Sequence, residues 1–190
     1  MLRTLSVALT VALGLGLQFT ASSNAVAARK LVKFDLEFPK GAIVIINSER
    51  KLYYVLGNGR AMRYPVAIGK RDEIWSGKQV ITQKRKYPSW THPETKRHVP
   101  GGPGNPLGDR ALYLGWTLWR IHGTPSTGSI GRAVSNGCIR MYNRDVTDLY
   151  ERVHIGAPVY VINGRSEATT ALNWGKKNIY QRRSKKIASN

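Results

Sequence analysis

Residues 135–141, Ser-Asn-Gly-Cys-Ile-Arg-Met, contain Cys138, the only cysteine of the 190-residue chain. An unperturbed thiol has a pKa of about 8.5, so a nucleophilic cysteine needs a neighbouring base near neutrality. His122 is the last residue of a largely apolar stretch, 111–122, and is predicted to lie at the end of a strand. The glycine-rich segment 123–134 could return the chain so that Cys138 faces this imidazole. Spacing alone leaves an inert thiol as the alternative.

The other three histidines are poorer candidates for the base. His92 and His98 lie in residues 87–107, and His154 follows a predicted helix, where the helix dipole favours a cation. Segment 87–107 contains five prolines and three glycines. An irregular loop of this length in a compact domain is usually functional or disordered. We hypothesise from its length that it covers a cleft as a lid.

One clear helix is predicted after the cysteine. Asn143 can cap its start, and Gly156 followed by Pro158 ends it. Its apolar face would consist of Val146, Leu149, Tyr150 and Val153. Because Cys138 precedes this helix by only a few residues, we expect the free N–H groups of the first turn to favour the thiolate.

The rest of the chain is rich in strand signals. Residues 42–70 contain β-rich runs separated by polar breaks at 47–49 and 57–59, which are typical of antiparallel hairpins. Residues 78–85 and 158–162 predict further strands. The sequence therefore predicts a mainly antiparallel β fold with one principal helix, and it disfavours a doubly wound α/β enzyme.

The N-terminus has the parts of a secretory signal peptide. Arg3 precedes an apolar run at 5–19, and Ala-Val-Ala at 25–27 forms a cleavage site of the A-x-A type. The run is short for a membrane span, which needs about 20 apolar residues, although an uncleaved anchor is the alternative. We expect residues 1–27 to be removed and the chain from Ala28 to act in the periplasm or cell wall, an oxidising compartment.

The composition restricts partners and chemistry. The formal net charge is +19, and 42% of the residues are hydrophobic. This charge favours an anionic partner, and for an exported protein we expect a cell-wall polymer or membrane surface rather than nucleic acid. Charge that serves solubility alone is the alternative. A single cysteine excludes an intramolecular disulfide and a cysteine-rich zinc site, so the thiol is buried, intermolecular or reactive.

Two motifs around the cysteine and histidine resemble a known catalytic domain. R-I-H-G-T at 120–124 and S-N-G-C-I-R-M-Y-N-R-D-V at 135–146 resemble the paired motif of the L,D-transpeptidase catalytic domain family, the YkuD type. That motif is a histidine, a variable loop and then S-H/N-G-C-x-R. Further similarity lies in P-G-G-P-G-N-P-L-G at 100–108, A-L-Y-L at 111–114 and D-L-Y-x-x-V-x-x-G-x-P-V at 148–159.

The resemblance implies a domain organisation and a fold. An antiparallel β-sandwich or barrel-like L,D-transpeptidase catalytic domain would occupy residues 40–163, with its principal helix after the cysteine. Residues 28–39 would be a lead-in. Residues 164–190 form a basic segment without clear apolar periodicity, which we interpret as a mobile cationic tail that docks partly through its aromatic residues.

The resemblance also implies roles for individual residues. Cys138 would be the nucleophile and His122 its proton partner, with the imidazole oriented by the backbone carbonyl of Gly123. The N–H groups of Gly137 and Cys138 would face the developing oxyanion. Arg140 matches the family arginine and would either bind a substrate carboxylate or hold the loop.

Asn136 is a departure, because many family members have histidine at this position. Asparagine also occurs there widely, and it donates a hydrogen bond without titrating, so His122 remains the predicted base. Ser135 would either bond within the turn or contact the stem peptide.

The function implied by the resemblance is peptidoglycan transpeptidation. The Cys138 thiolate would attack the third stem residue, typically meso-diaminopimelate, expel the terminal D-Ala and pass the acyl group to an amine. A second stem would give a 3→3 cross-link, and an outer-membrane protein or lipoprotein would become anchored to the wall. Hydrolysis by an L,D-carboxypeptidase, and a non-catalytic wall-binding module, are the alternatives. No metal or organic cofactor is implied.

Overall fold

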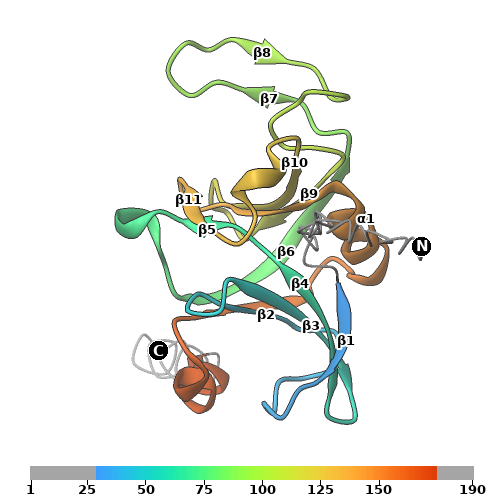
Figure 1. The fold of residues 1–190 in the computed structure, drawn as a ribbon, viewed down its shortest axis with the longest axis vertical. Coiled ribbons are helices and arrows are strands. Elements are labelled where there is room, and N and C mark those ends of the chain that lie inside the picture. Colours follow the sequence, from blue (N-terminus) through green and yellow to red (C-terminus); the bar gives the residue numbers. More distant parts are fainter. Residues whose placement is uncertain (1–28, 175–190) are drawn as a thin grey trace, which may run out of the picture.

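The computed structural model describes residues 29–174, so the expected signal peptide at 1–27 lies outside the described residues. Nine strands form one sheet, in the order β1-β4-β3-β2-β13-β6-β9-β10-β12 (Figure 1). These strands are β1 (Lys30–Lys33), β2 (Ile43–Ile46), β3 (Lys51–Gly57), β4 (Arg60–Pro65), β6 (Gly77–Lys86), β9 (Arg110–Leu114), β10 (Arg120–Thr124), β12 (Ile139–Tyr142) and β13 (Pro158–Ile162).

Two small ribbons and short helices complete the described chain. One ribbon pairs β5 (Ile68–Gly69) with β11 (Ala133–Ser135), and the other pairs β7 (Trp90–Thr91) with β8 (His98–Val99). The principal helix is α1 (Asn143–Arg152). The short helical turns are η1 (Arg71–Glu73), η2 (Thr127–Ser129) and η3 (Arg165–Glu167), and residues 168–174 continue η3 as a helix. No helix among the described residues is long and apolar enough to cross a membrane.

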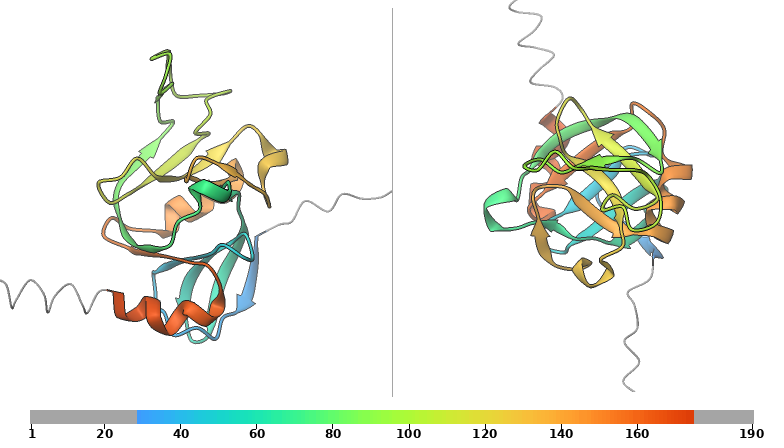
Figure 2. Two further views of the ribbon diagram at one scale, coloured as in Figure 1. Left: turned by 90° about the vertical axis from the view of Figure 1, so that its left-hand side faces the viewer. Right: turned by 90° about the horizontal axis from the view of Figure 1, so that it is seen from above.

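Strand β6 joins the two halves of the curled sheet (Figures 1 and 2). Its first residues pair with β13, its later residues pair with β9, and the register shifts between Ile81 and Gln83. A shift of this kind bends a strand and increases its twist. The nine-stranded sheet, with α1 as its principal helix, confirms the mainly β architecture predicted from the sequence.

The hydrophobic core lies on both faces of the sheet at β2. All four residues of β2 are buried, because alternate side chains point to opposite faces and both faces are covered. Ile43 and Ile45 join a cluster that includes Ile121, Ile139 and the apolar face of α1. Val44 and Ile46 join a second cluster, which is completed by Phe34, Phe38, Tyr53, Tyr160, Ala168 and Ala171.

Six of the eight pairings in the main sheet are antiparallel, in agreement with the predicted mainly antiparallel fold, and two are parallel. β2 pairs with β13, and β10 pairs with β12. Parallel neighbours need a crossover of about a dozen residues or more, and segment 125–138 supplies that length between β10 and β12. This crossover carries the chain back so that β12 runs beside β10 in the same direction.

The structure corrects the expectation of a single strand over residues 111–122. The stretch forms two antiparallel strands, β9 and β10, which turn around Gly115 with its positive φ of 55°. His122 therefore lies in the middle of β10 instead of at the end of a strand. The apolar run predicted one strand because residues 115–119, although they turn, include apolar side chains such as Trp116 and Leu118, which are exposed.

The basic C-terminal segment begins with packed structure. Ala168 and Ala171 are buried in the second cluster, and Leu172 and Trp174 pack against it. Residues 165–174 are thus packed on the sheet and are not part of a mobile tail, while the expected docking of an aromatic residue is present at Trp174. Residues 175–190 lie outside the described residues.

Candidate active site

Strand alternation on β10 and β12 separates core residues from cavity residues. Ile121 and Ile139 are paired and buried in the core. Because neighbouring residues in a strand face opposite sides, the residues before and after them face the other side. Those residues are Arg120 and His122 on β10, and Cys138 and Arg140 at β12. All four line one cavity, and so does Thr124, which lies two residues beyond His122 on the same face of β10.

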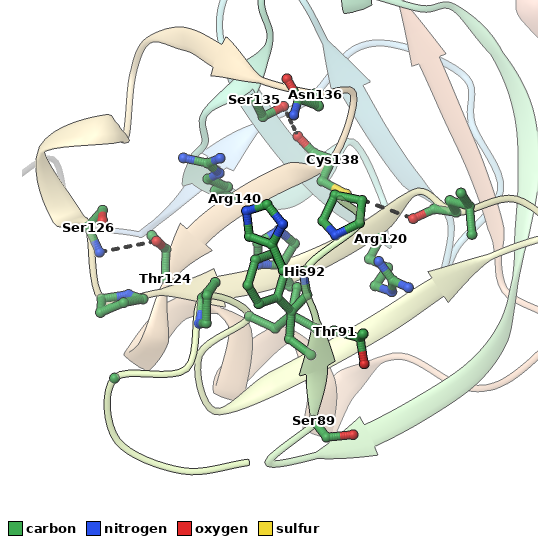
Figure 3. Close-up of a pocket in the computed structure, with 18 of the residues that line it drawn as sticks. Ser89, Thr91, His92, Arg120, Thr124, Ser126, Ser135, Asn136, Cys138 and Arg140 are labelled. Carbon is green, nitrogen blue, oxygen red and sulfur yellow. Dashed lines mark hydrogen bonds between the residues drawn. The ribbon is translucent and has the colours of Figure 1, made fainter. Parts of the chain in front are cut away.

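The cavity has a volume of about 920 Å³, and residues of the β7–β8 hairpin, such as Thr91 and His92, form part of its wall (Figure 3). Segment 87–107, expected as an irregular loop, thus contains a two-stranded ribbon with Trp90 opposite Val99. Its residues Trp90, Thr91, His92, Pro93 and Lys96 line the cavity. This position supports the hypothesis that the segment covers a cleft.

His122 is buried and held in one orientation. Its Nδ1 lies 2.6 Å from the carbonyl oxygen of Gly123, so Nδ1–H donates and Nε2 is left as an acceptor. Burial lowers the pKa of His122 to about 4, and the positive charges of Arg140 and Arg120 act in the same direction. The imidazole is therefore neutral near pH 7 and able to accept a proton.

The thiol of Cys138 is half-buried, and its Sγ lies 4.0 Å from the carbonyl oxygen of Leu118. Burial raises the pKa of this thiol, although Arg120 and Arg140 partly oppose the rise. The expectation that a helix start favours the thiolate is therefore wrong. The four residues of β12 separate Cys138 from α1 by about 13 Å at about 3.3 Å per residue, and the dipole effect falls off within the first helical turn.

The loop that carries the cysteine is fixed by two tryptophans. Gly137 has a φ of 93°, and a Cβ at this position would lie 2.5 Å from Nε1 of Trp119. Trp75 donates from its indole N–H to the carbonyl oxygen of Gly137 over 2.8 Å. The two indoles stack with their centroids 4.3 Å apart and their planes 8° apart.

Ser135 and Asn136 lie on the cavity wall beside the cysteine. The Ser135 hydroxyl donates to the carbonyl oxygen of Cys138 over 2.5 Å, which is the bond within the turn. Asn136 is exposed, and it stands beside the cavity as a group that does not titrate (Figure 3).

Two arginines make the cavity cationic. The backbone of Arg140 exchanges hydrogen bonds with Ala67 over 2.9 and 3.0 Å, while its side chain lines the cavity. The guanidinium carbon of Arg120 lies over the ring of Tyr113, 5.0 Å from the ring centroid. The buried Nε of Arg120 has no hydrogen-bond partner among the described residues. Arg120 was missed by sequence reasoning. The available signal was its position two residues before His122, which places it on the same face of the strand.

Asn143 supports the histidine strand from behind, and it does not cap the helix. It is the first residue of α1, where Tyr142 holds the capping position without a side-chain cap. Its Oδ1 accepts a hydrogen bond from the N–H of Asp109 over 3.2 Å. A Cβ at Gly108 or at Gly123 would lie 2.1 Å from the same oxygen. Gly123 is therefore needed for close packing as well as for its carbonyl.

The remaining predicted features lie away from the reacting groups. His98 on β8 and His154 after α1 are exposed and are not among the residues that line the cavity. Within residues 29–174, no three His, Cys, Asp or Glu side chains are grouped so that they could hold a metal ion. The expectation of a reaction without metal or cofactor stays a prediction.

Comparisons with known proteins agree on one catalytic domain. Residues 40–161 match the model of the L,D-transpeptidase catalytic domain, YkuD. The chain is 37% identical over 144 residues to the probable L,D-transpeptidase YbiS of Escherichia coli K12, a match that covers 67% of this chain and 46% of YbiS. It is 35% identical over 152 residues to the probable L,D-transpeptidase ErfK/SrfK of the same strain, covering 71% of this chain and 49% of that protein.

The chain thus spans about half the length of these two relatives. Solved structures are similar in fold at lower identity. An L,D-transpeptidase from Mycobacterium tuberculosis H37Rv has a TM-score of 0.54 at 19% identity, covering 65% of this chain and 57% of its own. An L,D-transpeptidase from Mycobacterium smegmatis has the same TM-score and identity, covering 64% and 58%.

Proposed function

The chain belongs to the L,D-transpeptidase catalytic domain family, and on that premise we propose that it is a peptidoglycan L,D-transpeptidase with Cys138 as its acyl carrier. The observation that carries this proposal is the parallel pairing of β10 with β12. The pairing places the His122 imidazole and the Cys138 thiol on the wall of one cationic cavity. Its arginines suit a substrate that bears carboxylates, as stem peptides do.

In the first half-reaction, Cys138 is acylated. The thiol gives its proton to Nε2 of His122 while the sulfur forms a bond to the carbonyl carbon of the third stem residue. The carbonyl electrons move to oxygen, and the backbone N–H groups of Gly137 and Cys138 stabilise the oxyanion. The C–N bond to the terminal D-Ala then breaks, and the imidazolium returns its proton to the leaving amine. A thioester and free D-Ala remain.

The electrostatics support a proton transfer that accompanies attack. Burial lowers the pKa of His122 to about 4 and raises the pKa of Cys138, so both groups are neutral in the resting site. A preformed thiolate–imidazolium pair would need the opposite order of the two pKa values. The thiol is therefore deprotonated as the C–S bond forms.

In the second half-reaction, an amine resolves the thioester. The neutral imidazole of His122 takes a proton from the attacking amine, a C–N bond forms, the C–S bond breaks, and the sulfur recovers the proton. We propose the side-chain amine of a second stem peptide as acceptor, which gives a 3→3 cross-link. An amine of an outer-membrane protein or lipoprotein would use the same chemistry, and water would give hydrolysis.

We also propose that the protein works in the periplasm or cell wall. The support is the charged start, apolar run and A-x-A site within residues 1–27, which are typical of a signal peptide. Peptidoglycan is found in that compartment, and the proposed substrate and location therefore agree.

The test is incubation of the full chain with purified disaccharide-tetrapeptide, followed by mass spectrometry. A cross-linked dimer with loss of D-Ala is the expected product, and Cys138→Ala and His122→Ala should abolish it. Bare tripeptide without dimer would identify a hydrolase. Unchanged substrate together with tight binding would identify a wall-binding module and would overturn the proposal.

A further inference from the structure

The proposed mechanism leaves one histidine of the cavity unused. His92, on the β7–β8 hairpin, lines the same cavity as Cys138 and Arg140. In the close-up its imidazole projects from the hairpin into the cavity, on the side of these two residues (Figure 3). The half-buried ring is thus available to a ligand that occupies the cavity.

The hairpin fixes which nitrogen of His92 can serve that ligand. Nδ1 accepts hydrogen bonds from the backbone N–H groups of Glu94 and Thr95, each over 3.2 Å. A nitrogen that accepts these bonds carries no hydrogen, so the hydrogen of the neutral ring is on Nε2. Nε2 is therefore preset as a donor.

The ring is also held in place by its neighbours. Trp90 contacts it edge to face, with the ring centroids 5.3 Å apart. The backbone pairing of Thr91 with His98 fixes the strand that leads to it. A donor with a fixed tautomer and a packed ring loses little conformational entropy when it binds a partner.

We propose that His92 is a substrate-positioning residue, whose Nε2–H donates a hydrogen bond to a peptide carbonyl oxygen of the donor stem. This inference rests on the proposed function. Arg120, Arg140 and Lys96 already supply positive charge to the cavity for carboxylates. A directional N–H donor adds recognition of an uncharged acceptor, and a peptide backbone presents such carbonyl oxygens. The contact would also tie the hairpin wall to the bound peptide.

The experiment compares two substitutions of His92 with a matched change on the same hairpin. In His92→Asn, the side-chain oxygen can still accept from Glu94 and Thr95, but no donor reaches the position of Nε2. His92→Gln keeps a donor near that position and loses the acceptor in the turn. His98→Asn is the control, because His98 is exposed and is not among the cavity-lining residues.

We expect His92→Asn to raise KM for the disaccharide-tetrapeptide about fivefold, with kcat within about twofold of wild type, because one hydrogen bond to the bound substrate is lost. His92→Gln should recover part of this loss, and His98→Asn should leave KM unchanged. An unchanged KM in His92→Asn, or an equal rise in His98→Asn, would overturn the inference. Turnover by the wild-type chain tests the proposed function separately.

A second measurement reads the hydrogen bond directly. In Cys138→Ala, which lacks the proposed nucleophile and should therefore not turn over substrate, long-range ¹H–¹⁵N spectra should show His92 with unprotonated Nδ1 and protonated Nε2. Addition of the disaccharide-tetrapeptide should shift the Nε2–H resonance of His92. Saturating substrate that shifts other cavity residues and leaves this resonance unmoved would contradict the proposed contact.

Discussion

His122 lies directly opposite Arg140 in the parallel pairing of β10 and β12. The guanidinium and the burial of the ring both disfavour the imidazolium, so the base of the proposed reaction is kept neutral. Arg120 and Cys138 each come directly before the paired residues Ile121 and Ile139, and Arg120 and Arg140 partly oppose the effect of burial on the pKa of the thiol. The site thus combines a weak base with a protonated thiol inside a positively charged cavity.

The pH dependence of turnover should reveal this arrangement. Below its pKa of about 4, His122 carries a proton and cannot accept one from Cys138. We expect kcat/KM for the tetrapeptide to hold from pH 7 to about pH 5 and to fall near pH 4. A fall centred at pH 6.5, the ordinary value for histidine, would show that the imidazole is not desolvated in the free enzyme.

Stability should depend on pH through the same residue. The pKa of His122 is about 4 in the folded state and near 6.5 in the unfolded chain, so only the unfolded chain binds this proton between those values. The free energy of unfolding should therefore fall as pH decreases from 7 to 4, by about 3 kcal/mol from this residue. Urea unfolding of wild type and His122→Asn at pH 7 and pH 4 measures this contribution of His122 to the free energy of unfolding.

His122→Asn does not titrate at this position, whereas every carboxyl group titrates in both proteins. The stability difference between wild type and variant should therefore shrink by about 3 kcal/mol between pH 7 and pH 4. A difference that stays constant over this range would mean that the folded and unfolded proteins share one pKa for His122.

The tryptophan pair beneath the cysteine loop gives a third prediction. Trp75→Phe keeps an aromatic ring against Trp119 and removes the N–H that holds the carbonyl of Gly137. Loss of this bond should cost about 1 kcal/mol of stability and lower kcat about tenfold, because the backbone N–H groups of the loop would be misplaced. Trp116→Phe is the control, since Trp116 is fully exposed. Equal kcat in Trp75→Phe and wild type would remove the positioning role.

The features that could be predicted from the sequence are those that depend on local sequence patterns. The β-rich runs identified the hairpins of β2, β3 and β4, and the paired motif identified the strand and loop that bring His122 and Cys138 to one cavity. Strand alternation could also have identified Arg120. These features depend on periodicity and on short spacings, which a single sequence displays.

Features that depend on the curl of the sheet could not be predicted in this way. Trp75 reaches Gly137 across 62 positions of the chain, and β2 lies parallel to β13 from the other end of the domain. The prediction that Cys138 favours the thiolate was wrong for a related reason. Sequence proximity suggested a helix start, whereas the pKa of Cys138 follows from burial, which only the folded structure reveals.

A second cavity beside the active site gives the last prediction. It has a volume of about 420 Å³ and shares Ser89 with the wall of the larger cavity. Its remaining lining residues are two cations, two tyrosines and two other side chains: Arg85, Lys86, Tyr87, Tyr113, Gln83 and Pro88. Cations beside aromatic rings suit a carboxylated saccharide. We therefore expect this second cavity to add to the binding of whole sacculi.

The double variant Arg85→Glu with Lys86→Glu should weaken binding to sacculi about tenfold at low salt, and high salt should narrow the difference from wild type. Turnover of soluble tetrapeptide should not change, because neither side chain touches the reacting groups. Lys30→Glu with Lys33→Glu on β1 makes the same change in net charge on exposed residues elsewhere. If this control loses as much binding in a pelleting assay, the loss is caused by the change in net charge, and the second cavity has no part in recognising the wall.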